Sequence, residues 1–282
     1  MRLIRAEILK LRRRWATYIV LGIVLALMAV VYLLIGLLAR GTSSGTAGLV
    51  TGFPAAYGVI NQFVFGLGSL LAVAYAAAIA GADWSFGVMR VIIARGESRT
   101  RYVLAKAVGL AIVLAIGVAI AYAAGMALSA MASGLLGSPI GQPFGERGLH
   151  DLAASLLLGT FVLLQRAAIG FAVAMVLRSQ LAGVVVGIVL YIAEPILSAI
   201  LFALSVGGNL RQALAPAEIQ WYQFLPFSIG DSALAAAGTS QDSGGFQFTP
   251  VPLEQALLAV GIYLVASIGI SMLSLRRAQV AG

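Results

Sequence analysis

The sequence has little of what a water-soluble protein needs. Only 10% of its 282 residues are charged, whereas 61% are hydrophobic, and the mean hydropathy is +1.02. A soluble domain carries about a quarter charged residues and about half apolar ones, so this chain lacks the polar surface to cover a water-soluble globule. The composition excludes a soluble enzyme, a secreted domain and a disordered chain. It indicates a polytopic membrane protein.

Several reactive groups are also missing. The absence of cysteine excludes disulfides, thiolate metal ligands and cysteine nucleophiles. The single histidine, His150, leaves no histidine cluster for a metal. The only lysines are Lys10 and Lys106, and no G-x-x-x-x-G-K-[ST] loop is present to hold nucleotide phosphates. We therefore expect a chain that is not itself an enzyme and that binds no metal or other cofactor.

Six long apolar runs are present instead. A helix of roughly 20 apolar residues crosses the hydrocarbon core of a bilayer, which is about 30 Å thick. The runs are continuous rather than alternating, which argues against a β-barrel. The predicted fold is an all-α polytopic membrane protein with one transmembrane domain over residues 1–282. Its transmembrane helices are expected at 15–39, 59–82, 102–131, 152–177, 181–206 and 256–275.

The cationic residues predict the orientation of these spans. Most of the 18 Lys and Arg residues precede the first span, separate the second from the third, or flank the fourth and the last. The opposite side carries only Arg40, Arg147 and Arg211. By the positive-inside rule we expect a multi-pass protein of the cytoplasmic membrane with both termini cytoplasmic. The formal charge of +8 is then a topology signal, and no nucleic-acid partner is expected.

The first 14 residues interleave apolar and basic side chains. Ile4, Ile8 and Leu11 recur at three- and four-residue steps, which place them on one helical face. We expect residues 1–14 to form an amphipathic connecting helix that lies on membrane lipid. The external segment 207–253 is long and partly apolar, and it predicts either short helices that dip into the membrane or a folded cap.

The cytoplasmic loop 83–101 has the most specific pattern. Asp83 is expected to cap the N-terminus of a short helix, Gly96 to end that helix, and Ser98 to cap the third span. This helix would carry far more apolar surface than a solvated turn requires. We therefore expect it to insert into a groove on another protein or to lie in the membrane interface.

The run Asp83-x3-Gly87-x7-Arg95-Gly96-x-Ser98-Arg99-x6-Lys106 resembles the cytoplasmic signature of ABC-2-type ABC transporter permeases, with Asp83 where that family usually has Glu. The likeness extends over nearly the whole chain. It implies a coupling helix that docks into a nucleotide-binding subunit, and short re-entrant helices before the last span. The coupling residues that it implies are Asp83, Trp84, Phe86, Gly87, Met89, Arg90, Arg95, Gly96, Ser98, Arg99 and Lys106.

The same resemblance implies the partners. Two copies of such a half-transporter pair and bind two ABC ATPase subunits, which carry ATP and Mg. The copies would meet through the first and fifth spans, with Gly183 and Gly187 as points of close approach. Pairing with a different half-transporter stays open.

Two ionisable residues lie well inside the predicted spans. Arg166 lies 12 residues before Arg178, and Glu194 lies 13 residues after Leu181, which is about 18 and 20 Å along consecutive antiparallel helices. A lone charge at such a depth costs at least about 2.5–3.5 kcal/mol. We therefore expect an Arg166–Glu194 ion pair with Gln165 as a third member. A structural role is favoured over substrate contact.

A permease subunit of an ABC transporter, exporting its substrate with ATP hydrolysed by a separate subunit, explains most of these patterns together. The alternative is an ion- or proton-coupled secondary transporter that uses Glu194 and Arg166. An integral-membrane enzyme is disfavoured because the sequence offers no constellation of catalytic groups at the membrane faces. Export is implied by the resemblance, and the substrate stays open.

Overall fold

The computed structural model describes residues 2–38, 51–88, 98–206, 219–238 and 251–277. Within these ranges the chain is helical and has no β-strand, and one isolated parallel bridge joins Phe53 to Gly141. Six helices are long and apolar enough to cross a membrane. The all-α, multi-pass prediction is therefore confirmed.

The spans are close to the predicted ranges, and all except the first extend further at one or both ends. Four of them are single helices: α2 (Trp15–Leu38), α7 (Arg99–Leu136), α10 (Gln180–Val206) and α13 (Leu253–Arg277). Each of the other two contains a π-helical turn. The second span consists of α4 (Ala56–Asn61), the π turn η1 (Gln62–Leu67) and α5 (Gly68–Ser85). The fourth consists of α8 (Glu146–Ala154), the π turn η2 (Ser155–Gly159) and α9 (Thr160–Leu177).

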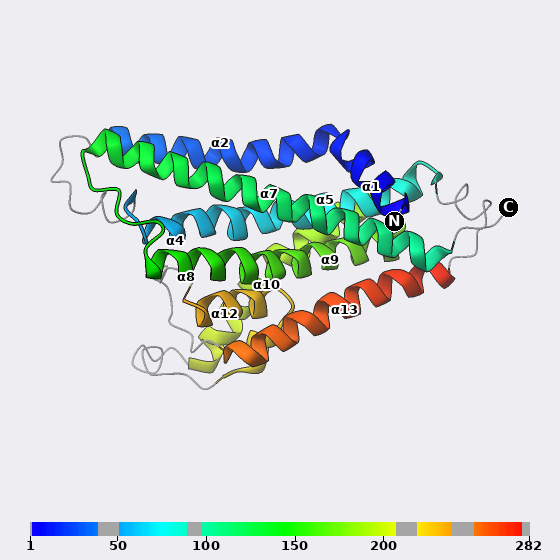
Figure 1. Cartoon of the computed structure of the whole chain (residues 1–282). Coiled ribbons are helices and arrows are strands. Elements are labelled where there is room, and N and C mark those ends of the chain that lie inside the picture. Colours follow the sequence, from blue (N-terminus) through cyan, green and yellow to red (C-terminus); the bar gives the residue numbers. More distant parts are fainter. Residues whose placement is uncertain (1, 39–50, 89–97, 207–218, 239–250, 278–282) are drawn as a thin grey trace.

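Three short elements complete the described chain. They are α1 (Arg2–Arg12), the 3-10 turn η3 (Trp221–Phe224) and α12 (Ser228–Ala236). Figure 1 shows the long helices running side by side, with α1, the end of α5, the start of α7 and the end of α13 gathered at one end of the bundle. We call this the α1 end. The helices α8 and α12 lie toward the other end, which we call the α12 end (Figure 1).

The centre of the bundle is formed by α5 and α9. In the most apolar 18-residue stretch of the second span and of the fourth, 56% of the residues are buried. In the corresponding stretch of α10 only 6% are buried. The close contact depends on glycine: a Cβ on Gly170 of α9 would lie 2.4 Å from the backbone oxygen of Val73 on α5. Small residues allow this approach of two helix backbones.

The glycines of α10 also face inward. A Cβ on Gly183 would lie 2.4 Å from Cβ of Ala174 on α9, and one on Gly187 would lie 3.1 Å from Val73 of α5. The expectation that these two glycines mark a contact between two copies is therefore wrong. Their spacing did predict close packing, but the sequence does not show which neighbouring helix is packed.

Candidate functional site

Arg166 of α9 connects the second span to α12. Its side chain is 1% exposed, and its guanidinium donates on two sides. Nη1 donates to the carbonyl oxygen of Phe65 at 3.0 Å and to Oγ of Ser69 at 3.2 Å. Nη2 donates to the carbonyl oxygen of Phe227 at 3.0 Å and to the Asp231 carboxylate at 2.6 Å. The ionic contact with Asp231 is the charge-assisted, stronger kind.

The π turn η1 supplies one of the two acceptors on this side of Arg166, the carbonyl oxygen of Phe65. A π turn inserts one extra residue into a helix and widens it, and such turns are frequent at functional sites. Phe65 and Gly66 lie in η1, and the carbonyl oxygen of Gly66 accepts a hydrogen bond from Tyr191 Oη at 3.0 Å. The ring of Tyr191 lies 5.8 Å from the guanidinium carbon of Arg166, in cation–π contact.

Glu194 of α10 binds the N-terminus of α12. One carboxylate oxygen accepts hydrogen bonds from the backbone N–H groups of Phe227 at 2.6 Å and Ser228 at 2.7 Å. The first N–H groups of a helix have no partner within the helix, and the N-terminus carries a partial positive charge. The carboxylate therefore provides both hydrogen-bond acceptors and the matching charge.

Gln165 and Gly230 complete this arrangement, which we call the α12 clamp: Gln165, Arg166 and Glu194 on the membrane helices, and residues 226–231 between them. Gln165 Nε2 donates to the carbonyl oxygen of Pro226 at 2.8 Å. A Cβ on Gly230 would lie 2.6 Å from Val162 and 3.1 Å from Nη2 of Arg166. Glycine at this position thus lets the α12 backbone lie directly against α9.

The predicted Arg166–Glu194 ion pair is wrong. Arg166 forms its ion pair with Asp231, and the Glu194 carboxylate binds Phe227 and Ser228 instead. The depth estimate was sound, since both side chains reach Phe227. The sequence does not show that a helix from the segment 207–253 lies between them and binds both charged side chains. One signal was available, because Asp231 is the only acidic residue between Glu218 and Asp242.

A second ionic cluster lies at the α1 end. The Asp83 carboxylate, on the last turn of α5, is 1% exposed. It accepts hydrogen bonds from Lys106 Nζ and Tyr102 Oη of α7, and from Lys10 Nζ of α1 at 3.1 Å. Lys10 also lies 3.8 Å from Glu7 on its own helix. One carboxylate therefore joins α1, α5 and α7, and we call this group the Asp83 cluster.

The expectation that Asp83 caps a following helix is therefore wrong. The helix α5 continues through Asp83 to Ser85, and the carboxylate binds two ammonium groups, which are stronger partners than neutral backbone N–H groups. Lys106 is 1% exposed like Asp83. The implied direct contact of both residues with another subunit conflicts with this burial.

Of the other predicted coupling residues, the structure describes five and leaves four outside its described ranges. Phe86 is 76% exposed, Gly87 adopts a left-handed conformation with φ 68°, and the Trp84 ring lies 5.5 Å from the guanidinium carbon of Arg178. Ser98 is the N-cap residue of α7, but its hydroxyl pairs with Thr100 and caps no backbone group. Arg99 donates to the carbonyl oxygens of Leu275 and Arg276 at the end of α13. Outside the described residues lie Met89, Arg90, Arg95 and Gly96.

The six candidate spans and the buried ionic contacts among them define a helical multi-pass membrane protein. Residues 44–281 match a family described as "Protein of unknown function (DUF2705)", and because this match covers most of the chain, the chain belongs to that family. No curated protein matches the chain. Within the described ranges, no three His, Asp or Glu side chains are grouped so as to hold a metal ion.

Proposed function

We propose that the chain is the permease subunit of an ABC transporter of the cytoplasmic membrane, and that it exports its substrate with ATP hydrolysed by a separate subunit. The observation that carries this proposal is the junction between α5 and α7. Phe86 lies exposed just beyond α5, three residues after the buried Asp83 that joins α1, α5 and α7. An exposed aromatic side chain on a rigid support suits a docking contact.

The contacts around this junction support a mechanical role. Ser85 Oγ accepts a hydrogen bond from the Gln180 N–H at the start of α10, and Arg99 binds the end of α13. The Asp83 cluster adds α1 and α7. A push on residues 84–98 would therefore reach most of the long helices directly. We propose that residues 83–101 form the coupling loop, with Phe86 as an anchor in a cleft of the ATPase subunit.

The α12 end supports the same function. The proposal expects short re-entrant helices before the last span, and η3 and α12 are short helices in that part of the chain. The α12 clamp holds α12 against residues well inside the fourth and fifth spans. We propose that both termini are cytoplasmic and that α12 dips into the outer leaflet.

The exposed helices support the proposed assembly. The helices α2 and α10 carry many exposed large apolar side chains. In their most apolar 18-residue stretches only 22% and 6% of the residues, respectively, are buried. These are the first and fifth spans. We propose that a second copy covers part of these helices and that membrane lipid covers the rest.

The test is capture of the ATPase subunit by Phe86→Ala. Truncation of an aromatic anchor in a desolvated cleft often costs about 2 kcal/mol or more, which is roughly 30-fold in affinity. The matched control is Phe144→Ala, because Phe144 is also an exposed phenylalanine, 62% exposed, but follows α7 toward the α12 end. We expect Phe86→Ala to lose ATPase binding and drug- or lipid-stimulated hydrolysis, while Phe144→Ala retains both. Equal binding by the two variants would overturn Phe86 as a docking anchor.

The alternative, an ion- or proton-coupled transporter, needs Glu194 as a carrier of protons or cations. Glu194 is instead bound to two backbone N–H groups of α12, which anchors that helix. Repeated release of these contacts would leave the start of α12 without acceptors. The geometry therefore favours a structural Glu194 and the permease.

A further inference from the structure

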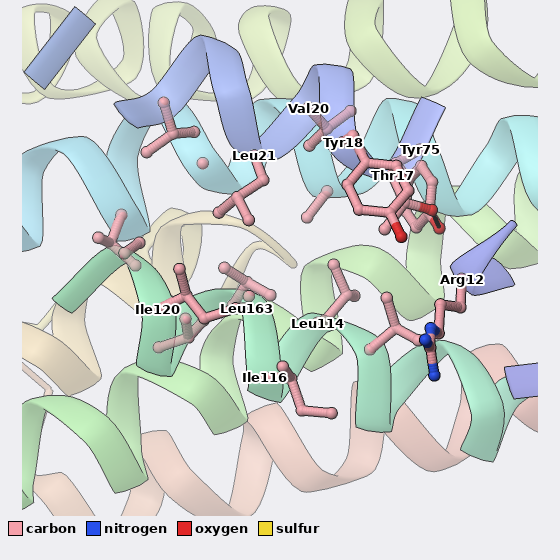
Figure 2. Close-up of a pocket in the computed structure, with 18 of the residues that line it drawn as sticks. Arg12, Thr17, Tyr18, Val20, Leu21, Tyr75, Leu114, Ile116, Ile120 and Leu163 are labelled. Atoms are coloured by element: carbon pink, nitrogen blue, oxygen red, sulfur yellow. Dashed lines mark hydrogen bonds between the residues drawn. The ribbon is translucent and has the colours of Figure 1, made fainter. Parts of the chain in front are cut away.

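A cavity of about 330 Å³ lies between α1, α2, α5, α7 and α9. Sites for small molecules commonly have about 300–1,000 Å³. Its walls are almost wholly apolar side chains, among them Leu21, Leu114, Ile120 and Leu163. The space is partly open, and in Figure 2 these side chains point toward one another from neighbouring helices.

The few polar groups of the cavity lie together at one end. Figure 2 shows Arg12, Thr17, Tyr18 and Tyr75 at this end, while Ile120 lies at the other. Thr17 Oγ1 donates to the carbonyl oxygen of Leu11 at 2.8 Å, and the hydroxyls of Thr17 and Tyr75 are 2.6 Å apart. These two hydroxyls are thus bonded to protein groups.

Arg12 differs from these hydroxyls. Within the described part of the chain its guanidinium forms no hydrogen bond and no ion pair, and its side chain is exposed. It lies at the end of α1, next to the first membrane span. An apolar slot that ends at an unpaired cation beside a membrane helix is complementary to a molecule with an apolar chain and an anionic head.

We propose that this cavity binds one alkyl chain of an anionic amphiphile, whose phosphate or carboxylate binds Arg12. The chain alone provides little selectivity, because the bilayer it leaves is as apolar as the cavity. Selectivity comes from the head group: one cation near the membrane surface contributes roughly fivefold in binding of an anionic lipid. The site does not depend on the ATPase subunit, and the proposed permease function and this site are tested separately.

Gly117 of α7 helps to form the space. It lines the cavity, and a Cβ built on it would have no atom within 4 Å. A leucine at this position would therefore fill the cavity without a clash at its Cβ. Gly134, also on α7, has equally open surroundings but does not line the cavity. The pair Gly117→Leu and Gly134→Leu thus separates cavity filling from a general effect of leucine on the helix.

The experiment uses the full chain in nanodiscs with lipid probes that carry a photoreactive group near the end of one alkyl chain. The probes are phosphatidylglycerol, phosphatidylcholine and free hexadecanoic acid, and labelled residues are mapped by mass spectrometry. We expect an anionic probe to label the cavity wall, including Leu114 and Ile120. Labelling by phosphatidylglycerol identifies a phospholipid as the occupant, and labelling by hexadecanoic acid alone identifies a free fatty acid.

Variants at both ends of the cavity complete the test. Arg12→Gln should lower labelling of the cavity wall by an anionic probe roughly fivefold, and Gly117→Leu should abolish it. Arg13→Gln, which removes the same charge from a residue that does not line the cavity, and Gly134→Leu should leave it unchanged. Equal labelling by the zwitterionic and anionic lipids, or labelling unchanged in Gly117→Leu, would overturn the site and indicate only general contact with bilayer lipid.

Discussion

Replacing Glu194 with leucine should release α12 from the membrane helices. The substitution removes the acceptor of two hydrogen bonds, from the N–H groups of Phe227 and Ser228. A hydrogen bond to a charged group contributes about 1.5–3 kcal/mol. Since Glu194 is only partly buried, the lower value applies, and the two bonds together contribute about 3 kcal/mol to the docking of α12.

The assay is amide hydrogen exchange over α12 in the purified protein. A loss of about 3 kcal/mol of local stability raises the exchange rate more than 100-fold when exchange follows local opening. Glu194→Gln retains an oxygen that accepts both N–H groups, but hydrogen bonds to a neutral oxygen are weaker, so the rate should rise only about 10-fold. The control is Ser198→Ala on the same helix, which removes one neutral hydrogen bond to Ser228 and should raise the rate by less than 10-fold.

The pattern of the three variants decides the role of Glu194. Wild-type exchange in Glu194→Leu would refute the capping of α12 by this carboxylate. A Glu194→Gln variant that keeps α12 protected but loses transport would contradict a structural role and support a proton carrier, because glutamine cannot ionise.

Two further predictions concern the packing of the helices. Lys106→Met leaves the buried Asp83 with one ammonium partner fewer and should lower the free energy of unfolding by about 3–5 kcal/mol. Combined with Asp83→Leu it should recover much of this stability, as measured by thermal unfolding in detergent. A double variant as unstable as the single one would contradict the ion pair. Gly170→Ala places a Cβ 2.4 Å from the backbone oxygen of Val73 and should lower the free energy of unfolding by about 1–3 kcal/mol. Gly269→Ala, whose Cβ meets no atom within 4 Å, should not be destabilising. Equal unfolding temperatures for these two variants would contradict the close contact of α5 and α9.

The spans were predictable because hydropathy alone determines them, but their local irregularities were not. The turns η1 and η2 each lie within a continuous apolar run, and one extra residue in a helical turn leaves no trace in composition. Yet η1 provides the Phe65 carbonyl oxygen that Arg166 binds. The sequence therefore indicates the buried cation, but none of the four groups that accept its hydrogen bonds.

The charged groups show the same limit. The sequence indicates that Asp83, Lys106, Arg166 and Glu194 matter, but it does not indicate their partners, because pairing depends on which helices meet in space. Asp83 was expected to bind backbone N–H groups and binds lysines, while Glu194 was expected to bind an arginine and binds backbone N–H groups. Depth along a helix can be counted from the sequence. A neighbour brought in from another part of the chain cannot.

The contacts of Arg166 also have an order in time, because the ribosome makes the chain from its N-terminus. Phe65 and Ser69 are already present when α9 is synthesised, whereas Asp231 follows 65 residues after Arg166. The fourth span therefore enters the membrane with its guanidinium lacking its carboxylate partner, at a cost of at least about 2.5 kcal/mol on insertion scales. The apolar residues of the span offset this cost, because its most apolar 18-residue stretch has a mean hydropathy of 1.9. Only the arrival of α12 completes the set of partners, so a nascent chain that stops short of it carries a buried cation without its anion.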